Sequence, residues 1–291
     1  MNYRHHYHAG NFADVMKHVL LLRLLRAMQR KEKGFLYLDT HAGRGRYDLS
    51  SAAQGDSQAR KPEWPEGIGR VWRSTSQPEA VSDYLNLVRS CADAGTPVGD
   101  GDEPRFYPGS PWLAQAVARA QDRLFLCETH PEEFEILRHE LSIARRATLQ
   151  QLDGYTALRA ALPPLEKRAL VLIDPPYEAQ NEFAVLVDGI EQSLKRLPAA
   201  TLAVWYPLTQ RARVDAFFDE LQHLRLPPCW TAELCVAGEA TALGMRGCGL
   251  LVINPPWQMD RELGPVLDWM KELLRQEPGA SAGLHWLVPE R

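Results

Sequence analysis

Cysteine is scarce in this chain of 291 residues, and the few cysteines follow no motif. There are five of them, an odd number, and none forms a Cys-x-x-Cys pair. This spacing supports neither a disulfide framework nor a zinc site with cysteine ligands. We expect reduced thiols, in the core or at the surface.

Long apolar runs are also missing. The longest candidate, VMKHVLLLRLLRAM, is interrupted by Lys17, His18, Arg23 and Arg26, and it falls short of the roughly 20 apolar residues that a membrane span needs. The first residues, MNYRHHYHAGNFADVMKH, lack the apolar region and the cleavage site of a secretory signal. With 45% hydrophobic and 24% charged residues, the composition is that of an ordinary globular protein. We therefore expect a soluble, cytoplasmic protein without a membrane partner.

A strong positive charge is absent from the chain as a whole, but not from its first part. The formal net charge is −4, which excludes a polycation that coats nucleic acid along its whole surface. Residues 1–47, however, contain nine Lys and Arg against three acidic residues, so this segment carries +6 and the rest carries −10. A basic patch on an acidic body suits a protein that grips a phosphate backbone at one place. A solvated basic helix face explains the same charge equally well.

The histidine cluster His5, His6 and His8 near the start of the chain has no carboxylate partner at the spacing typical of metal ligands. Metal sites in proteins need several such ligands in a defined geometry. We therefore read these histidines as solvated and expect no metal.

The pattern that begins at Asn11 predicts a long helix followed by a strand. Asn11 and Asp14 have the spacing of a helix cap, and apolar residues then recur with helical spacing until Gly34. We predict one amphipathic helix over residues 11–33. The stretch GFLYLDTHAGRGRY then predicts a short strand that ends at Asp39 and a glycine-rich loop.

Residues 48–108 interrupt this regular order. Their apolar content is low, and the stretches SSAAQGDSQARKP and DAGTPVGDGDEP are typical of flexible connections. Two short helices are predicted inside the segment, around Trp64–Arg73 and Pro78–Ala94. We interpret residues 48–108 as an inserted helical subdomain. The main domain then consists of residues 1–47, with the N-terminal tail, the long helix, the first strand and its glycine loop, and of residues 109–291.

Regular alternation of helices and strands resumes at Ser110, which we expect to be the N-cap of a helix with Pro111 at its first position. Strands are predicted at RLFLCE, ATLQQL, ALVLID and TLAVWY, each followed by a helix. Strands separated by helices form a parallel sheet that is covered on both faces. The runs WTAELCVA and GCGLLVINPPW have no helix-length pattern between them and predict an antiparallel hairpin at one edge. The predicted class is α/β with a Rossmann-like sheet, parallel strands plus a terminal antiparallel hairpin, similar to class I S-adenosylmethionine-dependent methyltransferases.

Two stretches of the chain share an unusual signature, DPPY at residues 174–177 and NPPW at residues 254–257. Each follows an apolar run, and an acid or amide, two prolines and an aromatic ring are what amino-group methyltransferases use to hold a planar amine. Ligands of open α/β sheets bind at the carboxyl ends of the parallel strands. DPPY follows a parallel strand, whereas NPPW follows the hairpin arm that runs the other way. We therefore predict that DPPY is the functional motif and that NPPW is a structural turn.

The residue types of DPPY suit chemistry on an exocyclic amine. The lone pair of such an amine is delocalised into the ring, so a site must restore tetrahedral character at the nitrogen. Asp174 can accept one N–H and the carbonyl of Pro175 another, while the two prolines stiffen the loop. Tyr177 offers a face on which a flipped base can stack. The plainer alternative is an acid that caps a Pro-Pro turn.

Acids at two further strand ends predict a nucleoside cofactor beside DPPY. The glycine loop is not Gly-x-Gly-x-x-Gly, which disfavours a nicotinamide enzyme. Glu128 ends the next strand, where an acid would meet a ribose diol. Asp153 and Gly154 follow the strand after that and suit an adenine ring with its amino group. Each acid alone could be a helix cap, but their order along the strand ends favours a cofactor site.

Several motifs together carry a family resemblance that covers nearly the whole chain. YRHHYHAGNFADVMKH, FLYLDTHAGRGRY, YPGSP, ETHP, DGY and LIDPPYE resemble the RlmJ family, the 23S ribosomal RNA adenine-N6 methyltransferases. The N-terminal stretch is the most specific of them, because general methyltransferases lack it. The family fold is a Rossmann-like methyltransferase with a small inserted helical subdomain. The sequence departs from the family pattern at Arg44, where relatives can carry a small residue, and in a longer insert around VGDGDEPRF.

The resemblance implies a role for each matching position. Asp174 matches the catalytic acid that accepts the proton, and Tyr3 and Lys17 match positions that handle the RNA substrate. Positions that match cofactor contacts are His18, His41, Ser110, Glu128, Asp153 and Gly154, with Asp174 beside them.

The implied activity is S-adenosyl-L-methionine-dependent methylation of N6 of one adenine in 23S rRNA, either naked or in an early assembly intermediate, by a monomer. Alternative enzymes share the motif: a DNA adenine or cytosine-N4 methyltransferase, or a protein glutamine-N5 methyltransferase. The absence of a large target-recognition domain disfavours the DNA enzymes, and the acid at position 174 disfavours the glutamine enzymes. An inactive RNA-binding fold in ribosome assembly is the alternative from another class, and the intact series of acids argues against it.

Overall fold

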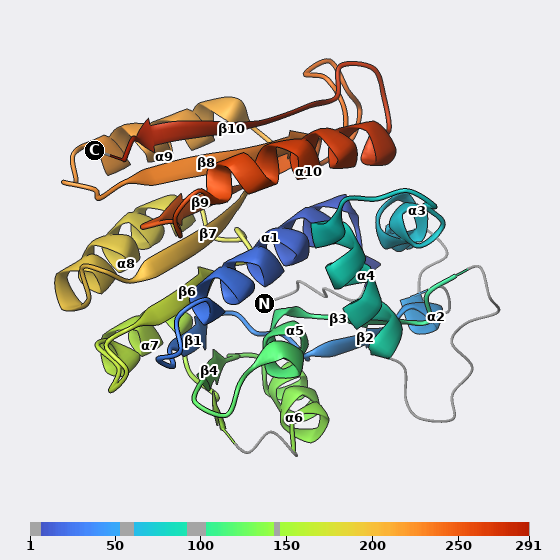
Figure 1. Cartoon of the computed structure of the whole chain (residues 1–291). Coiled ribbons are helices and arrows are strands. Elements are labelled where there is room, and N and C mark those ends of the chain that lie inside the picture. Colours follow the sequence, from blue (N-terminus) through green and yellow to red (C-terminus); the bar gives the residue numbers. More distant parts are fainter. Residues whose placement is uncertain (1–6, 53–60, 92–102, 143–145, 291) are drawn as a thin grey trace.

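An open, twisted sheet runs through the computed structural model of the chain, which describes residues 7–52, 61–91, 103–142 and 146–290 (Figure 1). Among these residues, eight strands form the sheet in the order β10-β8-β9-β7-β6-β1-β4-β5. Their bounds are β1 (Leu36–Asp39), β4 (Arg123–Cys127), β5 (Ala147–Gln150), β6 (Ala169–Ile173), β7 (Thr201–Pro207), β8 (Cys229–Cys235), β9 (Gly247–Ile253) and β10 (Ser281–Val288).

Strand directions confirm the predicted fold class. β5, β4, β1, β6 and β7 pair in parallel. β9 runs antiparallel to both β7 and β8, as the hairpin pattern predicts. The hairpin is not the edge of the sheet, however, because β10 pairs antiparallel with β8 outside it. Neither β10 nor the helix before it was predicted.

Helices cover both faces of the sheet because buried side chains alternate along its strands. On β6, Leu170 and Leu172 belong to the apolar core on one face, and Val171 and Ile173 belong to the core on the other. The first face carries α1 (Phe12–Gln29), α5 (Ser110–Val117), α6 (Pro131–Glu140) and α10 (Met259–Leu274). The second face carries α7 (Gly154–Ala161), α8 (Glu182–Arg196) and α9 (Arg211–Gln222).

Helix α1 ends at Gln29 and does not continue to Lys33 as predicted. The Arg119 guanidinium donates to the carbonyls of Gln29 and Lys31, which takes up acceptors at the end of the helix. Gly34 has a different role from the expected helix stop, because a Cβ there would collide with a backbone carbonyl just before β4. Neither α1 nor any other helix in the described part of the chain is both long and apolar enough to cross a membrane.

The segment around residues 48–108 leaves and rejoins the main domain at one place. Its ends pair as the antiparallel strands β2 (Arg46–Asp48) and β3 (Phe106–Pro108). Between them lie α2 (Leu49–Ala52), η2 (Trp64–Glu66), α3 (Ile68–Trp72) and α4 (Glu79–Ser90). Apolar side chains of α3 and α4 join the core that contains α1. α4 lies beside α1, and α3 lies near α10 (Figure 1).

The first of the two helices predicted in this segment is split. A single helix over Trp64–Arg73 was expected, but Gly67 separates the 3₁₀ turn η2 from α3. A Cβ at Gly67 would collide with the backbone of Gly10 and Asn11, so the chain turns where the segment meets the residues before α1. The second helix ends at Ser90 with Cys91 as its C-cap, and residues 92–94 of its predicted range lie outside the described residues.

Candidate active site

A cavity of about 850 Å³ opens at the carboxyl ends of the parallel strands. Its walls come from the loops after β1, β4, β6 and β7, from the first turns of α1, and from residues 61–66. Predicted site residues that line it are Lys17, His18, His41, Ser110, Glu128, Asp174, Pro175 and Tyr177. Asp153 and Gly154 are described but do not belong to its lining. Tyr3 lies outside the described residues.

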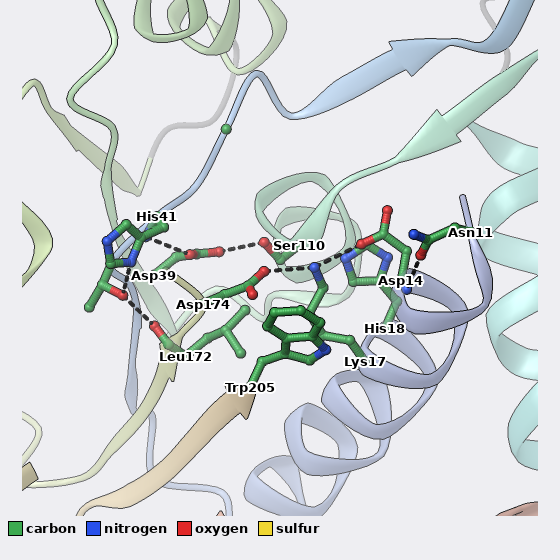
Figure 2. Close-up of polar contacts among 12 residues, drawn as sticks. Asn11, Asp14, Lys17, His18, Asp39, His41, Ser110, Leu172, Asp174 and Trp205 are labelled. Atoms are coloured by element: carbon green, nitrogen blue, oxygen red, sulfur yellow. Dashed lines mark hydrogen bonds and ion pairs between the residues drawn. The ribbon is translucent and has the colours of Figure 1, made fainter. Parts of the chain in front are cut away.

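The Asp174 carboxylate is paired with a buried lysine from α1 (Figure 2). Lys17 Nζ lies 2.6 Å from Asp174 Oδ2 and 2.8 Å from Asp14 Oδ1. Burial disfavours the charged ammonium, but the two carboxylates outweigh it and raise the pKa of Lys17 well above its ordinary value. The ammonium is therefore charged, and with Lys17 only 5% exposed it faces the acid of DPPY and not an open surface.

The first turn of α1 holds this ammonium in place. Asn11 is the N-cap, and its side-chain oxygen accepts from the Asp14 amide at 2.9 Å. Asp14 Oδ2 accepts from the Gly10 amide at 3.0 Å, which leaves Oδ1 for Lys17 one turn further along. The position of the lysine thus follows from the cap of the helix.

The ring of Tyr177 is clamped beside the Asp174 loop. Its backbone is left-handed, with φ at +54°. Its hydroxyl donates to the carbonyl of Trp205, and its ring centre lies 5.1 Å from Phe183 and 5.8 Å from Trp205. Burial raises the pKa of Tyr177 well above its ordinary value. The residue therefore stays protonated and can serve as a rigid aromatic wall.

Glu128 directly follows β4 and faces the glycine loop after β1. Its carboxylate accepts from the Gly43 amide at 2.9 Å and from the His130 amide at 2.7 Å. Gly43 has φ at +61°, and a Cβ there would lie 2.6 Å from the Tyr47 hydroxyl, so the loop needs glycine. Burial raises the pKa of Glu128 although these amides oppose the shift. The carboxylate keeps lone pairs for a further donor in the cavity.

The sequence suggested that Ser110 caps its helix, but in the structure it does not. Gly109 is the N-cap of α5, and the Ser110 hydroxyl donates to Asp39 Oδ2 at 2.7 Å. The Tyr37 hydroxyl donates to the same oxygen at 2.8 Å. Burial raises the pKa of Asp39 to about 6, although both hydroxyl groups oppose the shift. Asp39 was recognised only as the end of a strand, yet it anchors a predicted cofactor residue.

The two predicted histidines are held by neighbouring hydroxyl groups. His18 Nδ1 lies 2.7 Å from the hydroxyl of Tyr107, a residue of β3. His41 Nδ1 lies 2.8 Å from Thr40 Oγ1, and its ring meets Tyr155 edge-on at 5.7 Å. Burial lowers the pKa of His41 to about 4. This ring is therefore neutral near pH 7 and offers one donor and one acceptor.

Asp153 and Gly154 have clear structural roles. Asp153 is the N-cap of α7 and accepts from the Thr156 amide at 2.7 Å. A Cβ at Gly154 would collide with the Thr40 carbonyl, so only glycine lets α7 start so close to the loop after β1. Their predicted cofactor contacts stay a prediction.

The second Pro-Pro motif lies at the amino ends of the parallel strands, on the side of the sheet opposite to DPPY, as predicted. Asn254 follows β9, and its side-chain amide donates to the carbonyls of Pro198 and Ala200, each at 2.9 Å, in the turn before β7. Trp257 is 68% exposed. The side chain of Asn254 thus closes a turn, and a functional role for DPPY stays a prediction.

Comparisons with known proteins agree on one family. The family model described as "Ribosomal RNA large subunit methyltransferase D, RlmJ" matches residues 32–288. Two curated relatives named "Ribosomal RNA large subunit methyltransferase J" match over 290 residues and 100% of both chains, at 38% identity in Haemophilus influenzae and 37% in Escherichia coli K12. The crystal structure of protein LPL1258 from Legionella pneumophila has a TM-score of 0.82 at 33% identity, covering 96% of this chain and 98% of its own.

Proposed function

This chain belongs to the RlmJ family of large-subunit ribosomal RNA methyltransferases, and on that premise we propose that it methylates N6 of one adenine in 23S rRNA. S-adenosyl-L-methionine is the methyl donor, and when bound it supplies an electrophilic methyl group on its sulfonium. The substrate is 23S rRNA, naked or in an early assembly intermediate, and the enzyme acts as a cytoplasmic monomer.

The glycine-loop half of the cavity fits a nucleoside cofactor. Glu128 presents a carboxylate beside a loop that is free of side chains at Gly43. His130 Nδ1 also lines this part, and it is buried without a hydrogen-bond partner among the described residues. Such a group is satisfied when a polar ligand binds. The residues proposed to hold the cofactor are His18, His41, Ser110, Glu128, Asp153 and Gly154, with Asp174 beside the methyl group.

The DPPY half of the cavity fits a planar amine. The adenine flips out of its stack and lies on the ring of Tyr177. Its N6 donates one hydrogen to Asp174 and the other to the carbonyl of Pro175, which draws the lone pair back onto nitrogen. The two prolines fix the backbone φ of the loop, which holds this carbonyl in one direction. The bound cofactor would supply the methyl group for N6 and keep the electrons of its sulfur–carbon bond, and Asp174 or water would take the amine proton.

Lys17 orients the receiving acid. With Nζ 2.6 Å from Asp174, the ammonium fixes one carboxylate oxygen and leaves the other to the substrate. Positioning and exclusion of water then supply most of the rate. Lys17 therefore handles the RNA through the target base and not through a phosphate. A direct RNA contact at Tyr3 remains part of the proposal.

The Lys17–Asp174 pair inside the cavity is the observation that carries this function. An inactive RNA-binding fold has no use for a buried cation on the acid of DPPY. Family membership favours ribosomal RNA over the DNA and protein substrates of other enzymes with this motif.

The test is methyl transfer from labelled S-adenosyl-L-methionine to protein-free 23S rRNA, followed by nucleoside analysis. Wild type and the control Asp188→Ala, a change at an exposed position of α8, are expected to make N6-methyladenosine. Asp174→Ala is expected to bind the cofactor but to transfer at least about 100-fold more slowly. Cofactor binding without transfer by wild type would redirect the search to DNA, protein or preassembled ribosomal particles. Absence of cofactor binding would favour the inactive fold.

A further inference from the structure

The residues just before α1 are held by the segment inserted after β2. The Glu63 amide donates to the carbonyl of Tyr7 at 3.2 Å, and the Ile68 amide donates to the carbonyl of Gly10 at 2.8 Å. Gly67 lies so close to Gly10 that a Cβ would collide with it. The two stretches of chain are therefore docked along their backbones.

The carboxylate of Glu63 bridges two side chains of this docked stretch. Its Oε1 lies 3.0 Å from His8 Nδ1, and its Oε2 accepts from the Asn11 side-chain amide at 2.9 Å. Burial opposes ionisation, but these two contacts outweigh it and lower the pKa of Glu63. The group is therefore an anion near neutral pH and binds both partners in that form.

Asn11 connects Glu63 to the catalytic acid through a series of hydrogen bonds. Its side-chain oxygen accepts from the Asp14 amide at 2.9 Å, and Asp14 holds Lys17 Nζ at 2.8 Å. Lys17 Nζ in turn lies 2.6 Å from Asp174. Figure 2 shows the unbroken row from Asn11 to Asp174. Glu63 adds one more link, from a different part of the chain.

We propose that Glu63 is a positioning residue for methyl transfer, which gives the inserted segment a catalytic task. It fixes Asn11, so that the first turn of α1 presents Asp14 and Lys17 to Asp174 at the required distance. The inference rests on the proposed function, in which Asp174 receives a hydrogen of the adenine amine. Glu63 itself touches neither reacting group.

A small displacement is enough to make this role measurable. Without Glu63, the amide of Asn11 loses an ionised acceptor, and the N-cap of α1 can rotate away. Misplacement of a catalytic group by about 1 Å costs on the order of 100-fold in rate. We therefore expect a loss in kcat, because the adenine would still bind next to a misplaced acid.

The experiment compares Glu63→Ala and Glu63→Gln with the matched control Asp83→Asn. Asp83 also joins the inserted segment to α1, through Arg26 at 3.1 Å, but it lies on α4 and has no link to Asp174. We expect kcat on 23S rRNA to fall about 10- to 100-fold in Glu63→Ala. Glu63→Gln keeps an acceptor for Asn11 and should fall less. Cofactor affinity and the activity of Asp83→Asn should stay within about twofold of wild type.

Two further readouts separate positioning from a loss of folding. Hydrogen exchange of the α1 first-turn amides should accelerate in Glu63→Ala and not in Asp83→Asn, at temperatures well below unfolding. In a double-mutant cycle, Asn11→Ala combined with Glu63→Ala should lower kcat no more than the stronger single change, because both break one chain of contacts.

Equal kcat in Glu63→Ala and wild type would overturn the proposal, and so would equal losses in Glu63→Ala and Asp83→Asn. A wild-type protein that transfers no methyl group would contradict the proposed function instead. In that case the exchange measurement alone decides the inference, and unchanged exchange in Glu63→Ala would sink it.

Discussion

Lys17→Met should show how much the buried ammonium of Lys17 contributes to the stability of the folded protein. The change removes the ammonium between two carboxylates but keeps the length of the side chain. Asp14 is 3% exposed, so its charge would be left buried, whereas the Asp174 side chain is 17% exposed and can regain water from the cavity. Removing one partner of a buried pair costs about 3–5 kcal/mol. Because Asp174 can rehydrate, we expect the lower end, about 3 kcal/mol.

The assay is thermal unfolding at pH 7.5 and at pH 5. For a protein of this size, about 3 kcal/mol corresponds to a decrease of roughly 6 °C in Tm. The pKa of Lys17 is raised above 10.5, so its stabilisation is complete below that pH and is lost only above it. The wild-type cation is thus present at both pH values. The Tm of Lys17→Met should therefore be lower than that of wild type at both pH values.

The control for this prediction is Lys195→Met. Lys195 pairs with Glu191 at 2.8 Å, but its side chain is 60% exposed, and exposed pairs contribute about 0–1 kcal/mol. Its Tm should stay close to that of wild type, whereas Lys17→Met should also lose methyl transfer. A Tm for Lys17→Met within 1–2 °C of wild type at pH 7.5 would refute the reasoning from burial.

Three other predictions address separate groups of the site. Burial raises the pKa of Asp39 from 3.8 to about 6. As pH rises through that range, ionisation of Asp39 lowers the stability of the folded state by about 3 kcal/mol in all. Asp39→Asn should therefore flatten this part of the curve of unfolding free energy against pH. Tyr177→Phe keeps the stacking ring and should lose less than about tenfold in kcat/KM, whereas Tyr177→Ala should lose about 5- to 150-fold, the equivalent of 1–3 kcal/mol of stacking. Glu128→Ala should weaken cofactor binding by roughly 10- to 100-fold in calorimetry, since hydrogen bonds to a charged group contribute about 1.5–3 kcal/mol, and leave RNA affinity unchanged.

The sheet and the place of the site followed from hydrophobic patterns and turn signals. Strands separated by helices require parallel pairing, and that topology puts Asp174 and Asn254 at opposite edges, as observed. The last helix was missed because Gly264 and Pro265 within α10 are typical of a helix end. β10 lies at the edge of the sheet, where one face needs little burial and the apolar signal is weak.

The contacts within the site join residues that are far apart in the sequence, and no local sequence pattern predicts such contacts. Lys17 and Asp174 are 157 residues apart, and only the fold brings them together. A partial signal was present, because Asp14 and Lys17 have the i, i+3 spacing of a helical pair. Asp39 ends a strand just as the predicted acids do, so the same reasoning could have found it. The role of Ser110 needed the structure, since its hydroxyl serves Asp39 and not the helix.

The central claim is that Asp174, at the end of β6, directs a methyl group to adenine N6 in 23S rRNA. The most direct measurement is the N6-methyladenosine content of 23S rRNA, by mass spectrometry, from bacteria that lack their own RlmJ-family enzyme and carry this chain. We predict that the wild-type chain introduces one N6-methyladenosine and that Asp174→Asn, expressed to the same level, introduces none. No new N6-methyladenosine with the wild-type chain, or equal methylation by Asp174→Asn, would contradict the account.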